Sequence, residues 1–359
     1  MSTTISDIAK LAGTNRSTVS RVLNDSPNFS AGAECRKRII SIARKLKYQP
    51  RYSAKSLASG KTYCVGVILG TLENDLCSPY FASTLAEMNR TLLENGYTLT
   101  LLPINQGKVY DDEVLSTIRR HRCDGYFIGT DMAGSKTMNE LSRQKIPLAI
   151  HQASSGIVKS GLCNAAELDL RMAMESLAKE FARCSHQRVA YFVPEFFVND
   201  ERLAERLTQL QSALQRQGID MRDNDIITYR PSAIGCLFDR VEAMHAALLH
   251  VDALKLHTAV AACSDLVALG MCDALRMRGI EPGKDIGIVG YDNIEESPNF
   301  PTKEPFLTTI DPDNRRMGRV IAEMLLDRIR NPTSTPATRS IPARLIIRKS
   351  LGEPVNKSN

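Results

Sequence analysis

The sequence predicts an α/β protein: a small all-α helix-turn-helix headpiece with a hinge helix, followed by a two-lobed core of two doubly wound parallel sheets. Three observations support this fold class. The first fifty residues contain three short amphipathic helix patterns. After residue 63, apolar runs alternate with longer amphipathic segments, and a second series of the same kind follows the first. With 359 residues, 43% of them hydrophobic, the chain can form two or three domains with buried cores.

The first two helices have recognisable boundary signals. Thr4 and Asp7 have the spacing of a capping box, and Gly13 is expected to end the first helix. Asn15 is expected to cap a second helix over residues 16–23, whose serine and arginine side chains face outward. Two short helices joined by a tight turn therefore begin the chain.

A third helix and a linker complete the predicted headpiece. Residues 25–27 break the chain, and Ser30 is expected to cap a helix that runs to about Leu46. Pro50 ends this unit. Residues 51–60 are too few and too polar to form a stable helix alone, so they predict a conditional linker.

The rest of the chain predicts two doubly wound halves. Strands are expected at 65–69, 98–103, 126–129, 147–150, 188–193, 226–229, 259–263 and 286–291. Helices are expected, among other places, at 82–95, 165–183, 201–217 and 266–278. Repeated strand–helix–strand order gives parallel sheets with right-handed crossovers, and such sheets bind ligands beyond the carboxyl ends of their strands.

Positive charge is concentrated at the start of the chain. Residues 1–61 hold twelve Lys or Arg against three acidic residues, a balance of +9, which leaves −3 for the other 298 residues. A basic module on a slightly acidic body indicates a polyanionic partner such as DNA. A solvated basic face is the alternative that charge alone leaves open.

Several classes of function lack their motifs. Nine cysteines, odd in number and without a C-x-x-C pair, argue against a disulfide framework and a structural zinc site. No secretory signal or long apolar segment is recognisable, so a cytoplasmic protein is expected. The segment at 129–136 has its Ser and Lys in the wrong order for a P-loop, and His245, His250 and His257 are poorly spaced for a metal. We therefore expect no enzyme activity, no metal and no cofactor.

Specific segments resemble the LacI-type (LacI/GalR family) bacterial transcription regulators over nearly the whole chain. The most specific is TISDIAKLAGTNRSTVSRVLND at 4–25, and DIGIVGYDN at 285–293, LTTIDPDNRRMG at 307–318 and ARLIIRKS at 343–350 follow in family order. The resemblance implies a transcription regulator, most commonly a repressor, that binds a palindromic operator as a homodimer under the control of a sugar or similar polar metabolite. A periplasmic-type solute receptor and a doubly wound enzyme are the alternatives.

The resemblance also implies domain boundaries. The headpiece is expected at 1–49, the hinge helix at 50–61 and the effector-binding core, related to periplasmic binding proteins, at 62–359. Within the core, the N-subdomain is expected at about 62–164 plus 294–327. The C-subdomain is expected at about 165–293 plus 328–359. A dimer is favoured over a tetramer because the chain shows no C-terminal leucine heptad.

In such regulators the second helix enters the major groove of DNA. By position, Arg16, Ser17 and Arg21 face base edges, and Thr18 and Ser20 contact phosphates. Leu57, with Ala54 packed against it, matches the residue that wedges into the minor groove; packing on the core is its alternative. The other candidate DNA contacts are Thr4, Asn15, Asn24, Ser30, Tyr48, Arg51 and Lys55.

The effector site carried over from the family is less complete. Its candidate residues are Ser78, Tyr80, Gln152, Arg206, Ser264, Asp292 and Asn314. Asp265 is interpreted as a helix-capping residue or a ligand contact, and Arg206 with Asp292 as cleft residues or a structural ion pair. Gln152 and Ser264 depart from the acid and the Asn that sugar-binding members usually have, so the effector's identity stays open among sugars, sugar phosphates and nucleosides.

Overall fold

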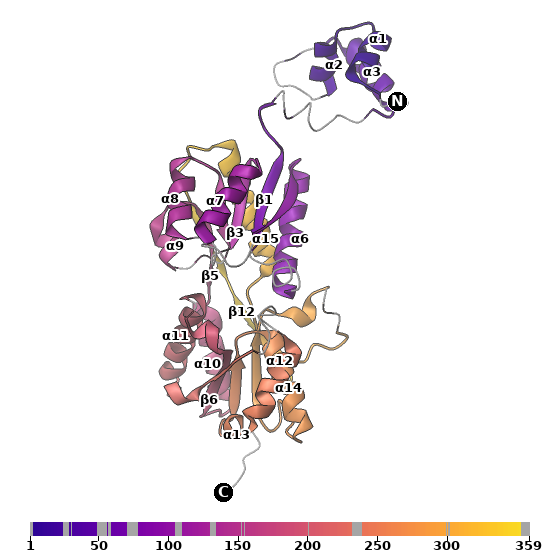
Figure 1. Ribbon diagram of the computed structural model, residues 1–359. Helices are drawn as coiled ribbons and strands as arrows, with labels where there is room; N and C mark the ends of the chain where they lie inside the picture. The colour runs from indigo at the N-terminus through magenta and orange to yellow at the C-terminus, as the bar shows by residue number, and fades with distance from the viewer. Residues whose placement is uncertain are drawn as a thin grey trace. The chain divides into compact units, whose positions relative to one another are not determined.

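The computed structural model divides the chain into two compact units, Met1–Tyr63 and Cys64–Asn359 (Figure 1). It describes residues 3–23, 29, 31–48, 56, 59–69, 78–104, 110–129, 134–151, 153, 155–199, 201–231, 239–298, 300 and 302–352. Among these residues, no helix combines the length and the apolar content that a membrane crossing requires.

Three helices form the first unit: α1 (Ile5–Ala12), α2 (Arg16–Leu23) and α3 (Ala33–Lys45). The predicted capping box is present, because Thr4 and Asp7 exchange side-chain and backbone hydrogen bonds. Gly13 ends α1 with a φ of 61°, a left-handed conformation that glycine adopts without a steric penalty. Asn15 Oδ1 accepts a hydrogen bond from the backbone N–H of Thr18 at 2.7 Å, as expected of the cap of α2.

The predicted start of α3 is wrong. The helix begins at Ala33 with Gly32 as its N-cap and no side-chain capping bond, whereas Ser30 lies outside the described residues. Buried apolar side chains from all three helices form one core: Ile8, Ala9, Ala12, Val19, Val22, Ile39 and Ala43. Leu23, Ile42 and Leu46 are only partly buried against this core.

The second unit has two lobes, each a six-stranded sheet (Figure 1). The strands of the first sheet are β1 (Cys64–Leu69), β2 (Thr98–Pro103), β3 (Gly125–Gly129), β4 (Leu148–His151), β5 (Asn164–Asp169) and β11 (Thr338–Pro342). Its helices are α6 (Pro79–Glu94), α7 (Tyr110–Arg120), α8 (Ser135–Arg143), α9 (Ser155–Ser160) and α15 (Asn314–Arg330). Helices α6 and α15 pack together, as do α7 and α8.

The second sheet consists of β6 (Val189–Pro194), β7 (Ile226–Tyr229), β8 (Ala259–Ala262), β9 (Gly287–Tyr291), β10 (Thr308–Asp311) and β12 (Arg344–Ile346). Its α-helices are α10 (Arg171–Arg183), α11 (Glu201–Arg216), α12 (Arg240–Leu249), α13 (Val251–Leu254) and α14 (Asp265–Met277). Short 3₁₀ turns η2 (Glu195–Asn199), η3 (Asp223–Asp225) and η4 (Ile294–Glu296) follow strands or precede them. Helices α12 and α14 pack together, and so do α10 and α11.

Both sheets have the same strand order. The orders are β11-β5-β4-β3-β1-β2 and β12-β10-β9-β8-β6-β7. All neighbouring strands are parallel except β10 and β12, which are antiparallel. The predicted pair of doubly wound halves is therefore confirmed, and each predicted strand matches an observed strand to within a residue or so.

The strands contradict two sequence expectations. Residues 164–169 form β5, not the start of the helix expected at 165–183, and α10 begins only at Arg171. The expected subdomain boundaries also fail: β5 and β11 belong to the first sheet, and β10 belongs to the second. Pairing with distant strands decides these memberships, and such pairing leaves no local signal in the sequence.

The chain crosses between the lobes three times, after β5, after β10 and after β11. Two of the crossings are bonded together, because the backbone N–H of Ala343 donates to the carbonyl of Asp169 at 2.9 Å. The crossing after β10 turns at Asp313, whose φ is 52° and whose side chain caps α15. These crossings bring the ends of β9 and β10 close to the starts of α6 and α15.

Candidate functional site

The outward face of α2 carries the residues that the sequence singled out. Arg16, Ser17 and Arg21 are exposed, while Thr18 and Ser20 are half-buried. Val19 and Val22 are buried and hold the helix on the headpiece core. The polar face of α2 is therefore presented by a helix whose opposite face is fixed by packing.

Two contacts restrain the side chains on this face. Asn15 Oδ1 accepts a hydrogen bond from Ser17 Oγ at 2.7 Å, in addition to its capping bond. The guanidinium carbon of Arg21 lies 5.2 Å from the ring centroid of Phe29, which is within the range of a cation–π contact. Phe29 packs against the headpiece core, so the ring that Arg21 contacts is held in place.

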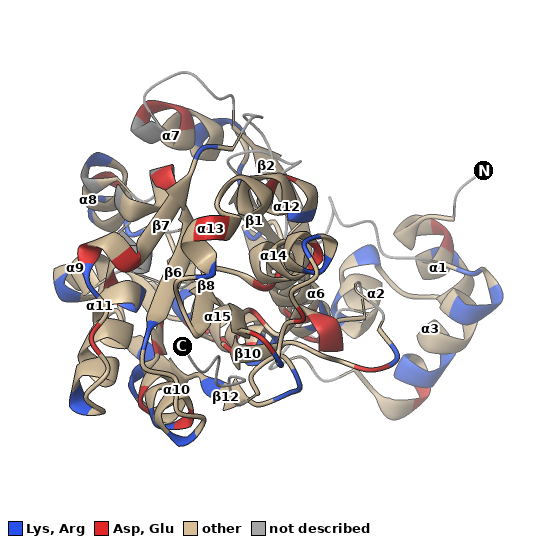
Figure 2. Cartoon of the chain, turned by 90° about the horizontal axis from the view of Figure 1, so that it is seen from below, with Lys and Arg blue, Asp and Glu red and all other residues tan. Residues whose placement is uncertain are grey.

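Cations dominate the described surface of the headpiece, as the blue segments on α1 to α3 show (Figure 2). Thr4 is engaged in its capping box, and Tyr48 packs partly buried against the core. The exposed cations are Lys10, Arg16, Arg21, Lys37, Arg38, Arg44, Lys45 and Lys47. The predicted DNA contacts Asn24, Ser30, Arg51, Ala54, Lys55 and Leu57 lie outside the described residues.

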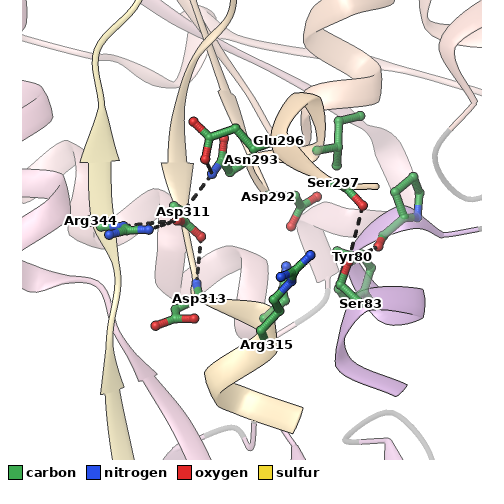
Figure 3. A pocket seen from close by; sticks show the side chains of 13 residues that line it. Tyr80, Ser83, Asp292, Asn293, Glu296, Ser297, Asp311, Asp313, Arg315 and Arg344 are labelled. Carbon is green, nitrogen blue, oxygen red and sulfur yellow. Dashed lines mark hydrogen bonds and ion pairs between the residues drawn. The ribbon is translucent and has the colours of Figure 1, made fainter. Parts of the chain in front are cut away.

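A pocket of about 270 Å³ lies between the lobes of the second unit (Figure 3). It sits beyond the carboxyl ends of β9 and β10 and at the N-terminal ends of α6 and α15, where ligands of doubly wound folds are expected. Its lining is mostly polar, and contains Pro79, Tyr80, Ser83, Asp292, Asn293, Ile294, Glu296, Ser297, Asp311, Asp313, Asn314, Arg315 and Arg344.

Three predicted effector residues, Tyr80, Asp292 and Asn314, line this pocket together. Ser78 precedes them as the N-cap of α6 and is half-buried. Gln152 lies outside the described residues. Of the residues predicted to form one effector site, Tyr80, Asp292 and Asn314 are thus brought together.

The backbone is strained where β9 ends. Asp292 has a φ of 112° and Asn293 a φ of 52°, and side chains other than glycine seldom adopt such values. The N–H of Asp292 donates to the carbonyl of Ile310 at 2.9 Å, and Asn293 Oδ1 accepts from Arg348 at 2.7 Å. Strain of this kind costs about 1–3 kcal/mol per residue and is concentrated at functional sites.

The carboxyl group of Asp292 is electrostatically unusual. Burial raises its pKa well above the ordinary value, Arg206 lowers it in part, and Asp265 and Asp311 raise it further. The guanidinium of Arg206 lies 3.8 Å from the ring centroid of Tyr291. Arg206 is not among the pocket-lining residues, and its guanidinium lies over the Tyr291 ring at the end of β9.

Several polar groups in and beside the pocket have no hydrogen-bond partner or ion-pair partner among the described residues. Asn314 Oδ1 is buried and unbonded at the start of α15. Arg315 lines the pocket without an ion pair, and Figure 3 shows its side chain extending toward Asp292. The Tyr291 hydroxyl, just before Asp292, is also buried and unbonded within the described chain. A buried polar atom without a partner is costly, so a ligand that bonds to it is stabilising.

Asp311 joins the lobe-crossing segments beside the pocket. Its carboxylate accepts hydrogen bonds from Arg344 at 2.8 Å, from Asn293 at 3.3 Å and from the N–H of Asp313 at 2.8 Å. Burial of Asp311 makes these bonds stronger than exposed ones. Ser83 Oγ and Ser297 Oγ lie 3.4 Å apart and connect α6 of the first lobe with the turn after η4 of the second (Figure 3).

The structure corrects the interpretation of Ser264 and Asp265. Ser264 is the N-cap of α14 and accepts a hydrogen bond from the N–H of Val267 at 3.3 Å, and it is not among the pocket-lining residues. Asp265 is fully buried and bonds Thr309 Oγ1 at 2.6 Å and the N–H of Ile294 at 2.9 Å. Asp265 is therefore not the N-cap of α14, and its side chain braces α14, β10 and η4.

Sequence reasoning missed most of the lining that follows β9 and β10. Asn293, Asp313 and Arg315 each stand next to a predicted residue, and Arg344 lies in the family-like segment at 343–350. Their adjacency to Asp292 and Asn314 was the available signal. Ser83, Glu296 and Ser297 carry no signal of their own, because only the packing of the two lobes brings them together.

No group of three or more His, Cys, Asp or Glu residues within the described segments is arranged to hold a metal ion. The cysteines in these segments are all free thiols. His257, one of the three histidines considered, bonds Asp225 at 2.8 Å.

Two family models match the chain. The model described as bacterial regulatory proteins, lacI family, matches residues 4–51, and the periplasmic binding protein-like domain matches residues 178–351. Together they span more than half of the chain. The boundary of the first match encloses the helices α1 to α3.

Curated and solved proteins of the same kind align over nearly the full length. A protein named HTH-type transcriptional repressor PurR, from Photobacterium profundum, is 26% identical over 349 residues, covering 97% of this chain and 98% of its own. The fold is similar to that of the Lac repressor dimer bound to operator and the anti-inducer ONPF (TM-score 0.75, 20% identity, 98% and 99% coverage). It is also similar to the transcriptional regulator CelR–cellobiose complex (TM-score 0.67, 22% identity, 97% and 99% coverage).

Proposed function

Because the chain belongs to the LacI family of bacterial regulatory proteins, a family of ligand-responsive transcription regulators, we propose that it represses transcription from a palindromic operator, which it binds as a homodimer. The observation that carries the proposal is the exposed polar face of α2, backed by a basic headpiece. We assign base contacts to Arg16, Ser17 and Arg21, and phosphate contacts to the surrounding cations. A protein that acts on chromosomal operators works in the cytoplasm.

The pocket is proposed to hold the effector. Asn314 Oδ1 and the carboxyl of Asp292 can accept hydrogen bonds, Arg315 can donate them, and Tyr80 offers an aromatic face. The pocket volume of about 270 Å³ is slightly below the ~300–1,000 Å³ that ligand pockets typically measure. The effector is therefore a small polar metabolite, a sugar or sugar derivative, with a hydrogen-bond donor for Asn314. The similarity to a regulator solved as a complex with cellobiose supports this class.

The effector is proposed to act through the lobes. It contacts α6 and α15 on one side and the residues after β9 on the other, so it favours one angle between the lobes. The Ser83–Ser297 contact and the hydrogen bonds of Asp311 join the same segments and therefore depend on the same angle between the lobes. We propose no catalytic step, because the pocket residues serve binding and because relatives such as the Photobacterium protein are named as transcriptional repressors.

DNA binding is tested by selecting bound sequences from a random pool and titrating the enriched palindrome by fluorescence anisotropy at several salt concentrations. The affinity is expected to fall steeply with salt because phosphate contacts release counterions. Arg16→Ala is expected to cost about 1–3 kcal/mol and to relax one base preference. Arg44→Ala on α3 is the matched control and should leave base preference unchanged. Failure to enrich any palindrome contradicts the proposal, as does binding that does not depend on salt.

Effector binding is tested by thermal-shift screening with sugars, sugar phosphates and nucleosides, followed by calorimetry with each compound that stabilises the chain. Asn314→Ala should weaken binding of such a compound about tenfold, the value of one lost hydrogen bond. Asn331→Ala, at the exposed far end of the same helix, is the control and should bind normally. No stabilisation by any of these classes contradicts the assignment, as does equal binding by both variants.

A further inference from the structure

Two cysteines face each other at the edge of the first sheet that is opposite the pocket. Cys64 is the first residue of β1, and Cys123 stands two residues before β3, the strand beside it. Cys123 Sγ donates to Cys64 Sγ across 3.7 Å. Both side chains are partly exposed, whereas Cys163 in the same lobe is buried. A thiol pair at this distance needs the sulfurs to approach by roughly 1.7 Å to reach a disulfide bond length.

Hydrogen bonds give the two thiols different characters. The bond from Cys123 lowers the pKa of Cys64 to about 6, burial opposes this, and Thr100 Oγ1, 2.9 Å from Cys64 Sγ, lowers it further. The same bond and burial raise the pKa of Cys123. The direction of the bond thus favours the thiolate on Cys64 and the proton on Cys123. This division suits an attacking and a resolving cysteine.

The neighbourhood holds Cys123 in place without forming a metal site. Its backbone N–H donates to Tyr126 Oη at 3.0 Å, and that hydroxyl donates to the carbonyl of Ile118 at 3.1 Å. Within the described residues, no third His, Cys, Asp or Glu joins the pair to complete a set of metal ligands. The chemistry open to the pair is therefore that of two neighbouring thiols, such as oxidation to a disulfide.

We propose that Cys64 and Cys123 are a redox-active dithiol that a hydroperoxide oxidises to an intramolecular disulfide. The Cys64 thiolate attacks a peroxide oxygen, an S–O bond forms and the O–O bond breaks, and the released oxyanion takes up a proton. Cys123 sulfur then attacks the sulfenic sulfur. The S–S bond forms, the S–O bond breaks, and hydroxide leaves with the Cys123 proton as water. Two electrons pass from the two thiols to the peroxide.

The position of Cys64 gives the disulfide a consequence. Tyr63, the residue before it, is the last of the headpiece unit, so Cys64 is where the chain enters the core. A disulfide fixes this entry point to the segment before β3. Oxidation is therefore expected to alter operator affinity, a part of the proposal that rests on the proposed function. A change of about fivefold or more is the usual scale of coupling between two sites.

The test treats the full chain with hydrogen peroxide, blocks free thiols by alkylation and maps peptides by mass spectrometry without reduction. We expect a Cys64–Cys123 cross-linked peptide that has lost two hydrogen atoms and that dithiothreitol separates. Cys123→Ser should instead leave a sulfenic acid on Cys64, trapped by dimedone. Cys163→Ser is the matched control and should form the disulfide normally. Operator affinity is measured before oxidation, after it, and after reduction.

The two readouts fail separately. Absence of the cross-linked peptide in the folded chain overturns the dithiol site, and this measurement needs no DNA. A disulfide that forms while operator affinity stays unchanged overturns the regulatory consequence. If the reduced chain binds no operator at all, the proposed function fails, and the mass measurement still decides the chemistry.

Discussion

Replacing Ile39 with alanine should remove most of the stability of the headpiece and leave the core intact. Ile39 is fully buried in a core of seven buried side chains. The change removes three buried carbon groups, worth about 2.4 kcal/mol at ~0.8 kcal/mol each, and the cavity brings the loss to roughly 3–4 kcal/mol. A unit of this size has only about 3–5 kcal/mol of stability to lose. Most of that stability is therefore removed by one substitution.

Peptide-resolved amide hydrogen exchange on the DNA-free chain checks this. In Ile39→Ala, peptides from α1 to α3 should exchange near the unfolded rate, while peptides from Cys64–Asn359 stay protected. If the substitution removes more free energy of unfolding than the headpiece has, operator affinity should fall about tenfold for each 1.4 kcal/mol of the excess. Ile288→Ala in β9, equally buried, is the control and should speed amide exchange in the core while the headpiece stays protected. A protected headpiece in Ile39→Ala, or loss of protection in both units at once, refutes the reasoning.

Two further substitutions test the core. A Cβ on Gly318 would lie 2.2 Å from the Thr84 carbonyl oxygen, so Gly318→Ala should push α15 away from α6, lower the stability measured by thermal unfolding by about 1–3 kcal/mol and weaken effector binding. The control is Arg319→Ala, an exposed neighbour, which should lower the stability by less than ~0.5 kcal/mol. Equal losses in the two variants would contradict the contact. Burial raises the pKa of Asp265 to about 7, above ~3.9 in the unfolded chain. The folded chain then keeps a proton that the unfolded chain loses, so stability falls as pH rises from about 4 to 7. Urea unfolding measures the free energy of unfolding of the unsubstituted chain and of Asp265→Asn at each pH. The unsubstituted chain should lose stability relative to the variant over this range, and a constant difference between the two would contradict the raised pKa of Asp265.

Short-range rules made the headpiece readable. The capping box of Thr4 and Asp7, the left-handed Gly13 and the cap at Asn15 each depend on residues within four positions, and all three are present. The same logic failed at Ser30, because α3 begins at Gly32–Ala33 with no side-chain cap, so no local signal marks its start.

Strands with apolar runs were also predictable, since a buried parallel strand is apolar on both faces. β5 was not, because its sequence NAAELD has no such run and its strand conformation depends on pairing with β4 and β11. β10 and β12 complete the second sheet in the same way. Their membership in one lobe or the other follows from which distant partner each strand finds.

By itself the sequence determined the α/β class and the basic helix-turn-helix, and the family resemblance pointed to Tyr80, Asp292 and Asn314, which line the pocket. The tertiary structure alone decided the braced role of Asp265, the pocket lining at Arg315 and Arg344, and the pairing of Cys64 with Cys123. The physical reason is range. Caps, turns and periodicity act within a few residues, whereas a pocket and a thiol pair are made by segments up to more than two hundred residues apart, and only folding brings them together.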